Sequence, residues 1–577
     1  MLKTHTGTGE VEGIFLDMSK IRDIDLKPAV FANMYNLRLL KIYNSHNLMK
    51  KCKLHFPQGL QSLPDALRYL HWYGYPLKSL PSDFNPENLV VLEMPHSQVE
   101  KLWNEDQYLD KLRKIDLSYS KNLIQFPDLS QAPHLESMNL EGYKSLLQVP
   151  SYFQYFNKLA TLNLSGNSNL KNLTAIPQSV QYLSLEDTGI EELSSSIGSL
   201  KNLISLVLRN CKELKTLSSN MHTLQSLDHL NLHGCSSLDN FPLLPTNIKY
   251  LNLNGTAIEQ VPSQIEGLSS LQILDLGNCR RLKTVPKRIM PVTQALNDYK
   301  PDIEEVSFMN CLELDENART NVMEYAQFRI LRIATASLRL GHVYVCRSIS
   351  LSLCIFLSIS SQIRRVPTLC LLPGKRIPKW FSYQSEGSSI NINLPPHWFS
   401  PKFLGFALCA VVGFENYKDY SSLMFQTESE FKTNCGESHR FDTQLWGWSG
   451  DESWGVFRVQ RLVDSDHVFL WYDYSLNLNF VKGKDGENWF TNLHDATEAS
   501  FEFYPVDMFS DPIDACYVKK CGVCLVYAQD SPTDMDQDVG ESSKGKRSRE
   551  ASGPSGSGVV ICDEEDEEEQ EPKSKRS

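Results

Sequence analysis

The sequence predicts a leucine-rich-repeat solenoid, an α/β horseshoe with short convex elements, followed by an all-β sandwich and a disordered acidic tail. Three observations support this prediction. A short leucine motif recurs every 21 to 24 residues through much of the first half of the chain. Residues 367–527 alternate apolar and polar positions in short runs separated by turn residues, which favours an antiparallel sandwich. Residues 528–577 carry 14 Asp and Glu against 7 Lys and Arg and contain no aromatic side chain, which is typical of disorder.

The recurring motif is LxxLxL, in which other apolar residues replace some of the leucines. Its period lies within the 20–29 residues of leucine-rich repeats, and the steps from Leu67 to Leu271 are too regular to be chance. A first unit is expected at Val11. The motif begins at Leu37, Leu67, Leu89, Leu112, Leu135, Leu159, Val180, Leu203, Leu227, Ile248, Leu271 and Ile303.

Each unit should contain one strand, because the last two apolar positions of the motif are two residues apart and therefore point into one core. The other half of a unit reads L-x-x-L/F/V-P. Since proline disfavours a continued helix, the convex side is predicted to consist of short loops and 3₁₀ turns. Three residues after the motif, small polar side chains can satisfy main-chain groups of the turn, and we interpret them as structural rather than metal-binding. They are Asn167, Thr188, Cys211, Cys235, Thr256, Cys279 and Cys311.

The strands of such a solenoid line a concave face, which is the candidate ligand-binding surface. Its exposed positions are the x residues of the motif and the one or two residues that follow. Aromatic side chains and Arg are common anchors of protein interfaces, whereas an ordinary solvated surface is the alternative for any one position. The candidates are Tyr69, His71, Tyr73, Lys114, Asp116, Tyr119, Arg209, His229, His233, Lys249 and Tyr250.

Composition shifts divide the chain into five segments. They are an N-terminal linker with the first repeat (1–36), the repeats (37–317), a capping helix with an apolar, Ser-rich connector (318–366), the sandwich (367–527) and the tail (528–577).

The helix is predicted over 314–340, where apolar residues at positions 322, 326, 330 and 333 share one face. It should cap the open end of the solenoid. The following uncharged run is rich in Ser and falls short of the roughly 20 apolar residues of a membrane span. No span is expected, and residues 343–361 are a buried strand or helix, or an irregular insertion.

The second domain contains a pair of Trp residues and a CxxC pair, which could have a functional or a structural role. Trp446 and Trp448 lie in the loop-like stretch DTQLWGWSGDE and are candidate partner contacts, with core packing as the alternative. Cys521 and Cys524 form a CxxC pair that leads into an apolar strand rather than a helix, so we interpret the pair as structural.

Short basic clusters in the tail are candidate nuclear-import signals, and a solvating tail is the alternative. The basic residues are Lys544, Lys546, Arg547, Arg549, Lys573, Lys575 and Arg576.

Composition and motifs limit the possible functions. The net charge of −12 argues against general nucleic-acid binding. The 14 scattered Cys favour a reducing compartment, and the first residues contain no apolar signal-peptide core, so we expect a cytoplasmic or nuclear protein, or both. The string GESSKGK (540–546) is followed by Arg547 where a phosphate-binding loop needs Ser or Thr. No Ser/His/Asp arrangement and no HExxH motif suggests catalysis, and no metal site is expected.

Three stretches resemble the C-terminal part of plant intracellular immune receptors of the TIR-NB-LRR class. TGTGEVEGIFLDMSKIRDIDLKPAVFANMYNLRLLKIY (6–43) resembles the segment that joins the nucleotide-binding module to the repeats. LRYLHWYGYPLKSLPSDFNPENLVVLEMPHSQVEKLW (67–103) is similar to the early repeats, and CLLPGKRIPKWFSYQSEGSSININLPPHWFSPKFLGFALCAVV (370–412) resembles the start of the jelly-roll-like post-LRR or C-JID domain.

The resemblance implies a function in defence signalling by protein binding. In such receptors the repeats and the post-LRR domain bind a pathogen effector or a guarded host protein, and NB-LRR receptors can be partners. ADP or ATP and NAD belong to domains of the relatives that this chain lacks, so the chain itself is expected to hold no cofactor and to be no enzyme. We expect the chain to be the recognition region of a longer receptor, through truncation. The alternative is a stand-alone regulator that binds a full-length receptor or host target. A membrane-anchored repeat receptor and an enzyme are less consistent with the sequence.

Overall fold

The structure is a computed structural model of the chain. It describes residues 2, 6–45, 52–103, 107–124, 127–289, 305–347, 365–366, 370–400, 402–415, 417–419, 423–448, 461–463, 465–473, 493, 495–507 and 510–528. Residues 1–528 group into one unit.

The repeats form a parallel sheet, as the sequence predicted. Every strand begins two residues after the start of its motif, including the expected first unit at Val11. The register is in phase, so that Leu183 lies beside Leu162 on one side and Leu206 on the other. The strands are β1 (Gly13–Asp17), β3 (Leu39–Tyr43), β5 (Tyr69–Trp72), β6 (Val91–Glu93), β7 (Lys114–Asp116), β8 (Ser137–Asn139), β9 (Thr161–Asn163), β10 (Tyr182–Ser184), β11 (Ser205–Val207), β12 (His229–Asn231), β13 (Tyr250–Asn252), β14 (Ile273–Asp275) and β15 (Glu305–Ser307).

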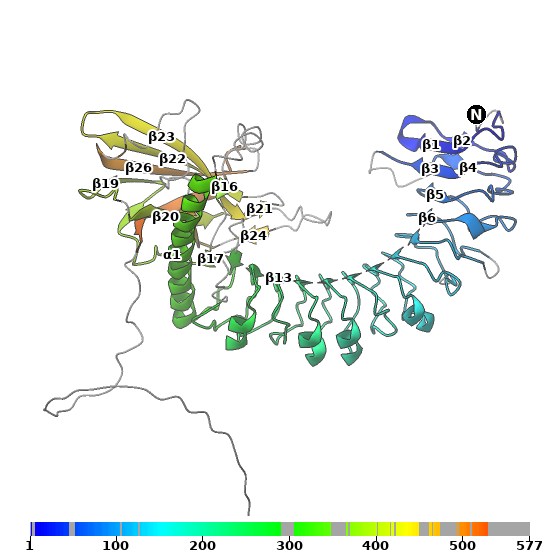
Figure 1. Cartoon of the computed structure of the whole chain (residues 1–577), viewed down its shortest axis with the longest axis horizontal. Coiled ribbons are helices and arrows are strands. Elements are labelled where there is room, and N and C mark those ends of the chain that lie inside the picture. Colours follow the sequence, from blue (N-terminus) through cyan, green and yellow to red (C-terminus); the bar gives the residue numbers. More distant parts are fainter. Residues whose placement is uncertain are drawn as a thin grey trace, which may run out of the picture. The chain divides into compact units, whose positions relative to one another are not determined.

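The convex side consists of loops and short 3₁₀ helices, which confirms the prediction from the proline-containing half of the unit. Figure 1 shows these short helices along the outer side of the stacked repeats. They are η2 (Pro86–Asn88), η3 (Ser151–Tyr155), η4 (Ser195–Ser199), η5 (Ser219–Thr223) and η6 (Ser263–Gly267). Near the N-terminus, η1 (Met18–Lys20) follows β1, and β2 (Ile24–Asp25) pairs with β4 (Leu54–His55).

The small polar residues after the motif bind main-chain carbonyls inside the solenoid. The thiol of Cys279 donates to the carbonyl of Leu253 in the preceding unit at 3.1 Å, and Thr256 donates to the same carbonyl at 2.8 Å. Asn167 likewise donates to two carbonyls. These residues therefore satisfy polar groups that neighbouring turns would otherwise bury unpaired.

The described residues of the C-terminal half contain one long helix and two sheets, whose strand pairings are antiparallel except that the short strand β16 (Arg365–Val366) pairs in parallel with β23 (Ser438–Trp448). The helix α1 (Glu316–Arg347) confirms the helix predicted after the last repeat. The first sheet comprises β17 (Cys370–Pro373), β25 (His467–Asp473), β20 (Phe403–Phe414), β27 (Cys516–Tyr527) and β18 (Tyr383–Glu386). The second comprises β16, β23, β22 (Leu423–Thr433), β26 (Ala496–Val506) and β19 (Ser389–Asn393). A small ribbon pairs β21 (Tyr417–Asp419) with β24 (Arg461–Val463).

The strand β20 belongs to the first sheet, which lies between the helix α1 and the second sheet. It is buried on both faces, because Leu404 and Cys409 pack toward α1 whereas Phe406 and Leu408 pack into the core between the two sheets. The helix supplies its predicted apolar face to this contact, and its buried members include Val322 and Ile330. Such burial on both faces explains why the strand reads as a continuous apolar run.

The last repeat and the sandwich share one sheet. The strand β15 pairs in parallel with β17, which then pairs antiparallel with β25. Arg319 of α1 donates to the carbonyls of Leu312, Leu314 and Pro373, and thereby joins the last turn of the solenoid to β17. The predicted capping role is therefore shared, because the helix and the sandwich together close the end of the repeats.

Candidate functional site

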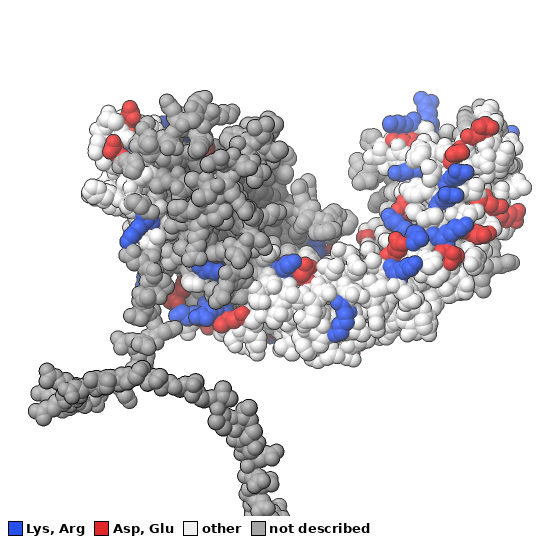
Figure 2. Space-filling view, in the orientation of Figure 1, with Lys and Arg blue, Asp and Glu red and all other residues white. Residues whose placement is uncertain are grey.

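The concave face is formed by the outward-pointing residues of the repeat strands. In β7, for example, Lys114 and Asp116 flank the buried Ile115. The in-phase register places equivalent residues of successive units side by side. The sequence-predicted candidates lie in two groups on this face, one in units with strands β5 to β7 and the other in units with strands β11 to β13. Figure 2 shows charged side chains of both signs crowded over the N-terminal repeats.

Glu93 is the centre of the first group. Tyr69 donates a hydrogen bond to its carboxylate at 3.0 Å, and Nδ1 of His71 lies 2.9 Å from the same oxygen. The ammonium of Lys114 lies 2.6 Å from the other oxygen. Three predicted candidates from two different strands are therefore held together by one acid. Glu93 occupies an x position of the motif that begins at Leu89, but its role could not be predicted from the sequence, because only the strand register reveals its neighbours.

The charge of Glu93 is strongly favoured in this setting. Its side chain is 14% exposed, and hydrogen bonding from His71, with further support from Lys114 and Tyr69, lowers the pKa of Glu93 to about 2 against the cost of burial. The pKa of Tyr69 is raised to about 12 by burial and by its bond to Glu93. The cluster is thus a preorganised polar patch in which Glu93 is charged and Tyr69 is neutral at neutral pH.

Next to this patch lies an aromatic stack of Tyr73, His96 and Tyr119. The ring centroids of Tyr73 and His96 are 5.0 Å apart. Those of His96 and Tyr119 are 4.9 Å apart with an interplanar angle of 10°. The three rings come from successive repeat units and are partly exposed. Stacked rings of this kind offer a large contact area at a small cost in side-chain entropy.

Two members of the aromatic stack occupy a strained backbone position. The residue seven positions after the motif start has positive φ in each unit from Leu67 to Ile303, and it is Gly, Asn or Asp in most of them. His96 and Tyr119 stand at this position with φ of 59° and 55°. A bulky side chain there costs of order 1–3 kcal/mol, and such strain tends to occur at functional sites.

The neighbouring unit makes room for the aromatic stack. A Cβ atom on Gly142 would lie 3.0 Å from Cδ1 of Tyr119, so the next strained position is a glycine. The phenol of Tyr119 donates to Glu141, and burial together with this hydrogen bond raises the pKa of Tyr119 above its usual range. Glu141 also accepts from Asn163 at 3.2 Å, which fixes its carboxylate.

Asp116 has a structural role in addition to its place on the face. Its Oδ1 accepts from the main-chain N–H of Ser118 at 2.8 Å, and its Oδ2 accepts from Asn139 at 3.1 Å. Asn231 and Asp275 cap their own turns in the same way. This column of Asp and Asn residues therefore holds the turn that follows each strand.

The second group is less open than the sequence analysis expected. Arg209 is buried, with 5% of its surface exposed, because its guanidinium turns back to Glu186 at 3.7 Å. It is not the exposed anchor that was predicted. His229 and Tyr250 stack face to face with centroids 4.2 Å apart, which brings these two candidates together.

Lys249 and His233 complete the second group. The ammonium of Lys249 pairs with Asp228 at 3.2 Å. His233 follows β12, and its main-chain N–H is bound by the side chain of Asn231. The group therefore offers a ring pair and one exposed cation to a ligand.

Other predicted features lie away from this face or outside the described residues. Trp446 and Trp448 are the last residues of β23, opposite Met424 and Leu423 of β22, so the expected loop is instead a strand. The glycine between the two Trp residues and the turn-prone residues that follow made the stretch resemble a loop, so the sequence did not reveal this strand pairing. The import candidates at 544–549 and 573–576 lie outside the described residues, as does most of 343–361.

The cysteine interpretation agrees with the geometry. Cys521 is buried in β27, and its pKa is raised to about 12 by burial, which describes an inert thiol rather than a redox centre. Among the described residues, no group of three or more His, Cys, Asp or Glu is placed to hold a metal ion. Within the same residues, no helix has the length and apolar character that crossing a membrane requires.

The fold and this face define a leucine-rich-repeat protein with a C-terminal β-sandwich. Residues 88–107 match the Leucine Rich Repeat family, and residues 372–532 match the C-JID domain family. The chain is 31% identical to the disease resistance-like protein DSC1 of Arabidopsis thaliana, over 93% of this chain and 52% of that protein. It is also 31% identical to the disease resistance protein RPS4B of Arabidopsis thaliana, over 91% of this chain and 46% of that protein.

The chain is therefore related, over more than nine tenths of its length, to the leucine-rich-repeat and C-JID region of plant TIR-NB-LRR disease resistance proteins. It spans about half the length of the curated relatives it matches. Among solved structures, the leucine-rich repeat domain of the type III effector XCV3220 (XopL) is 27% identical, over 38% of this chain and 76% of that chain, with a TM-score of 0.32.

Proposed function

We propose that this chain is the ligand-recognition region of an intracellular plant immune receptor. It binds a pathogen effector, or a host protein that an effector attacks, and it acts by protein binding in the cytoplasm, the nucleus or both. Signalling activity and its nucleotide and NAD cofactors belong to other domains of such a receptor. The kinship to disease resistance proteins supports the receptor context.

The aromatic stack carries the proposal for the binding surface. The chain tolerates positive φ at His96 and Tyr119, where most other units have Gly, Asn or Asp. Packing of the solenoid does not require these rings, since units with glycine form the same turn. Binding accounts for the strain, because partly exposed stacked rings beside a fixed charged patch are the usual anchors of a protein interface.

A binding screen with a matched pair of variants tests this proposal. The purified full-length chain is screened against a panel of purified pathogen effectors by surface plasmon resonance. Replacing Tyr73 and Tyr119 together by Ala should weaken binding of a captured effector by about 30-fold or more, which corresponds to the roughly 2 kcal/mol of an interface hot spot. The control is Tyr155→Ala, because Tyr155 is 70% exposed on the convex helix η3.

Effector binding by the wild type, the double variant and the control decides between three interpretations. Lost binding in the double variant, with unchanged thermal unfolding and normal binding by the control, supports the proposal. Equal binding by all three proteins would show that the effector binds elsewhere than at the aromatic stack. Binding to a full-length receptor and to no effector would favour the stand-alone regulator.

A further inference from the structure

Two repeat units are shorter than their neighbours, and each leaves a cleft on the convex side. The units that begin at Leu159 and Leu227 have 21 residues, and neither contains a 3₁₀ helix. A cleft of about 540 Å³ lies at each, lined mainly by residues of the short unit and of the unit that follows. The preceding unit adds Gln154 and Asn157 to the first cleft, and a third unit adds Lys283 and Thr284 to the second. The shortened convex segment thus leaves a space that a 3₁₀ helix occupies elsewhere.

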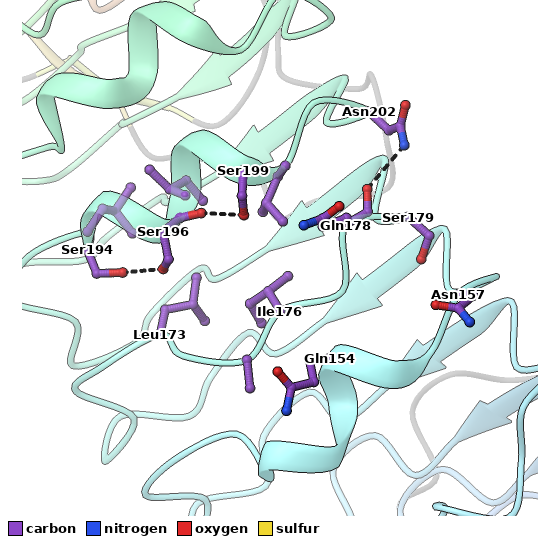
Figure 3. Close-up of a pocket in the computed structure, with 14 residues that line it drawn as sticks. Gln154, Asn157, Leu173, Ile176, Gln178, Ser179, Ser194, Ser196, Ser199 and Asn202 are labelled. Atoms are coloured by element: carbon purple, nitrogen blue, oxygen red, sulfur yellow. Dashed lines mark hydrogen bonds between the residues drawn. The ribbon is translucent and has the colours of Figure 1, made fainter.

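The cleft at the first short unit has an apolar floor and a neutral polar rim (Figure 3). Leu173, Leu193 and Ile197 are buried, and they form much of the floor. Carboxamides and hydroxyls surround it, and no charged or aromatic side chain lines it. The lining residues of the rim are Gln154, Asn157, Gln178, Ser179, Ser194, Ser196, Ser199 and Asn202.

The serines of this rim are already engaged, whereas three carboxamides are not. Ser199 donates to the carbonyl of Ser196 at 2.7 Å, and Ser196 shares a hydrogen bond with Ser194. The side chains of Gln154, Asn157 and Gln178 make no hydrogen bond with the described part of the chain. Each offers two donors and an acceptor to a ligand.

The main chain beside this cleft is also open. Within the described residues, the N–H and C=O groups of 173–176 make no hydrogen bond. The next unit differs, because Leu193 donates to the carbonyl of Thr216 and Lys215 donates to that of Glu191. The ladder of bonds between convex segments is thus interrupted at the cleft. Ala175 in this segment has φ of 58°, a strained value for a residue with a Cβ.

We infer that the convex cleft between residues 173–179 and 193–202 binds a short, uncharged peptide segment of a partner protein. The peptide main chain bonds to the open groups of 173–176 and to the three free carboxamides, while an apolar side chain covers the floor. The absence of charge in the lining argues against phosphorylated or acidic ligands. The absence of a ring argues against a sugar, which is commonly held by stacking on an aromatic face.

The second cleft provides an internal comparison. It has the same volume, but Asp239, Glu259 and Lys283 line it. Its main chain is similar, because within the described residues the N–H and C=O groups of 241–244 also make no main-chain hydrogen bond, so the two clefts differ in the charge of their linings. The second cleft should therefore not bind the same peptides.

Peptide selection on the full chain tests the inference, which does not depend on the proposed concave face. A displayed library of random decapeptides is selected on the 577-residue protein. The variants are Ser196→Trp and Gln264→Trp, which place a large ring at equivalent, exposed positions of η4 and η6 on the rims of the two clefts. Selected peptides should be uncharged, and Ser196→Trp should weaken them by about tenfold or more, whereas Gln264→Trp should leave their affinity unchanged.

Two further measurements use the selected peptide itself. Bound peptide should slow amide hydrogen exchange at 173–176, and methylation of alternate main-chain nitrogens of the peptide should abolish binding. Selection that yields only charged peptides, or peptides that bind equally to Ser196→Trp, would overturn the inference. Slowed exchange at 173–176 by cellohexaose, with no peptide enriched, would overturn it as well.

Discussion

Replacing Glu93 by Gln tests whether the first concave group is held together by one acid. The carboxylate is largely buried and accepts contacts from Tyr69, His71 and Lys114. Its pKa falls from 4.5 to about 2 in the folded chain. At about 1.4 kcal/mol per pKa unit, this shift corresponds to about 3 kcal/mol of stabilisation at neutral pH. The amide keeps one acceptor but turns donors toward groups that also donate, so we expect a local loss of about 2–3 kcal/mol.

The pH dependence has a definite sign. Because the folded-state pKa of Glu93 is depressed, its contribution is fully present above the unfolded value of 4.5 and disappears as the pH falls toward about 2. The difference between the wild type and Glu93→Gln should therefore be largest at pH 7. It should shrink progressively below pH 4.5.

Amide hydrogen exchange of β5, β6 and β7 is the suitable assay, since stability in a solenoid is local. The control is Glu87→Gln, an exposed acid of η2, which should change the local opening free energy by less than about 0.5 kcal/mol. An equal effect of both substitutions, or a Glu93 effect that is the same at pH 7 and pH 3, would refute the reasoning.

Three other substitutions or reagents test the strained turns, the junction and the buried thiols. Gly142→Ala should destabilise the chain by about 1 kcal/mol more than Gly255→Ala, because both have positive φ but only the first meets the aromatic stack; equal melting temperatures would contradict this. Arg319→Ala should cost about 3 kcal/mol by removing three charge-assisted bonds, with faster proteolysis at the junction, and Lys should not rescue it. Iodoacetamide at pH 8 should label the exposed Cys435 well before the buried Cys279, because burial raises the pKa of Cys279 to about 12. Equal labelling rates of the two thiols, followed by mass spectrometry, would argue against the burial of Cys279 in the solenoid core.

The repeat strands were predictable because the repeat period fixes both where each strand lies and which of its side chains point into the core. Each strand starts two residues into its motif, and the proline-containing half excludes long convex helices. The strained positions left a signal as well. Residues seven positions after the motif start are mostly Gly, Asn or Asp, so His96 and Tyr119 depart visibly from the pattern. That departure could have identified the aromatic stack from the sequence.

Lateral contacts could not be predicted in the same way. Glu93 on β6 pairs with Lys114 on the neighbouring strand β7, and Arg209 turns back to Glu186 of the preceding unit. The exposure of each long side chain on the concave face therefore depends on which partner it reaches. The topology of the sandwich was equally hidden. The strand β20 pairs with β25 and β27, both distant in sequence, and only their packing decides that order.

The junction between repeats and sandwich explains how the solenoid ends. A terminal unit exposes a sheet edge and one face of the core, and both need cover. Here β17 covers the edge of β15, while Met309 of the last unit is buried in the core between the two sandwich sheets. Nε2 of His467, fully buried on β25, accepts from the main-chain N–H of Asn310 at 3.0 Å. The sandwich is thus the C-terminal cap of the repeats as well as a domain with its own core. Because the cap and the last unit share hydrogen bonds and core residues, the stability of the units with strands β14 and β15 depends on the sandwich being folded.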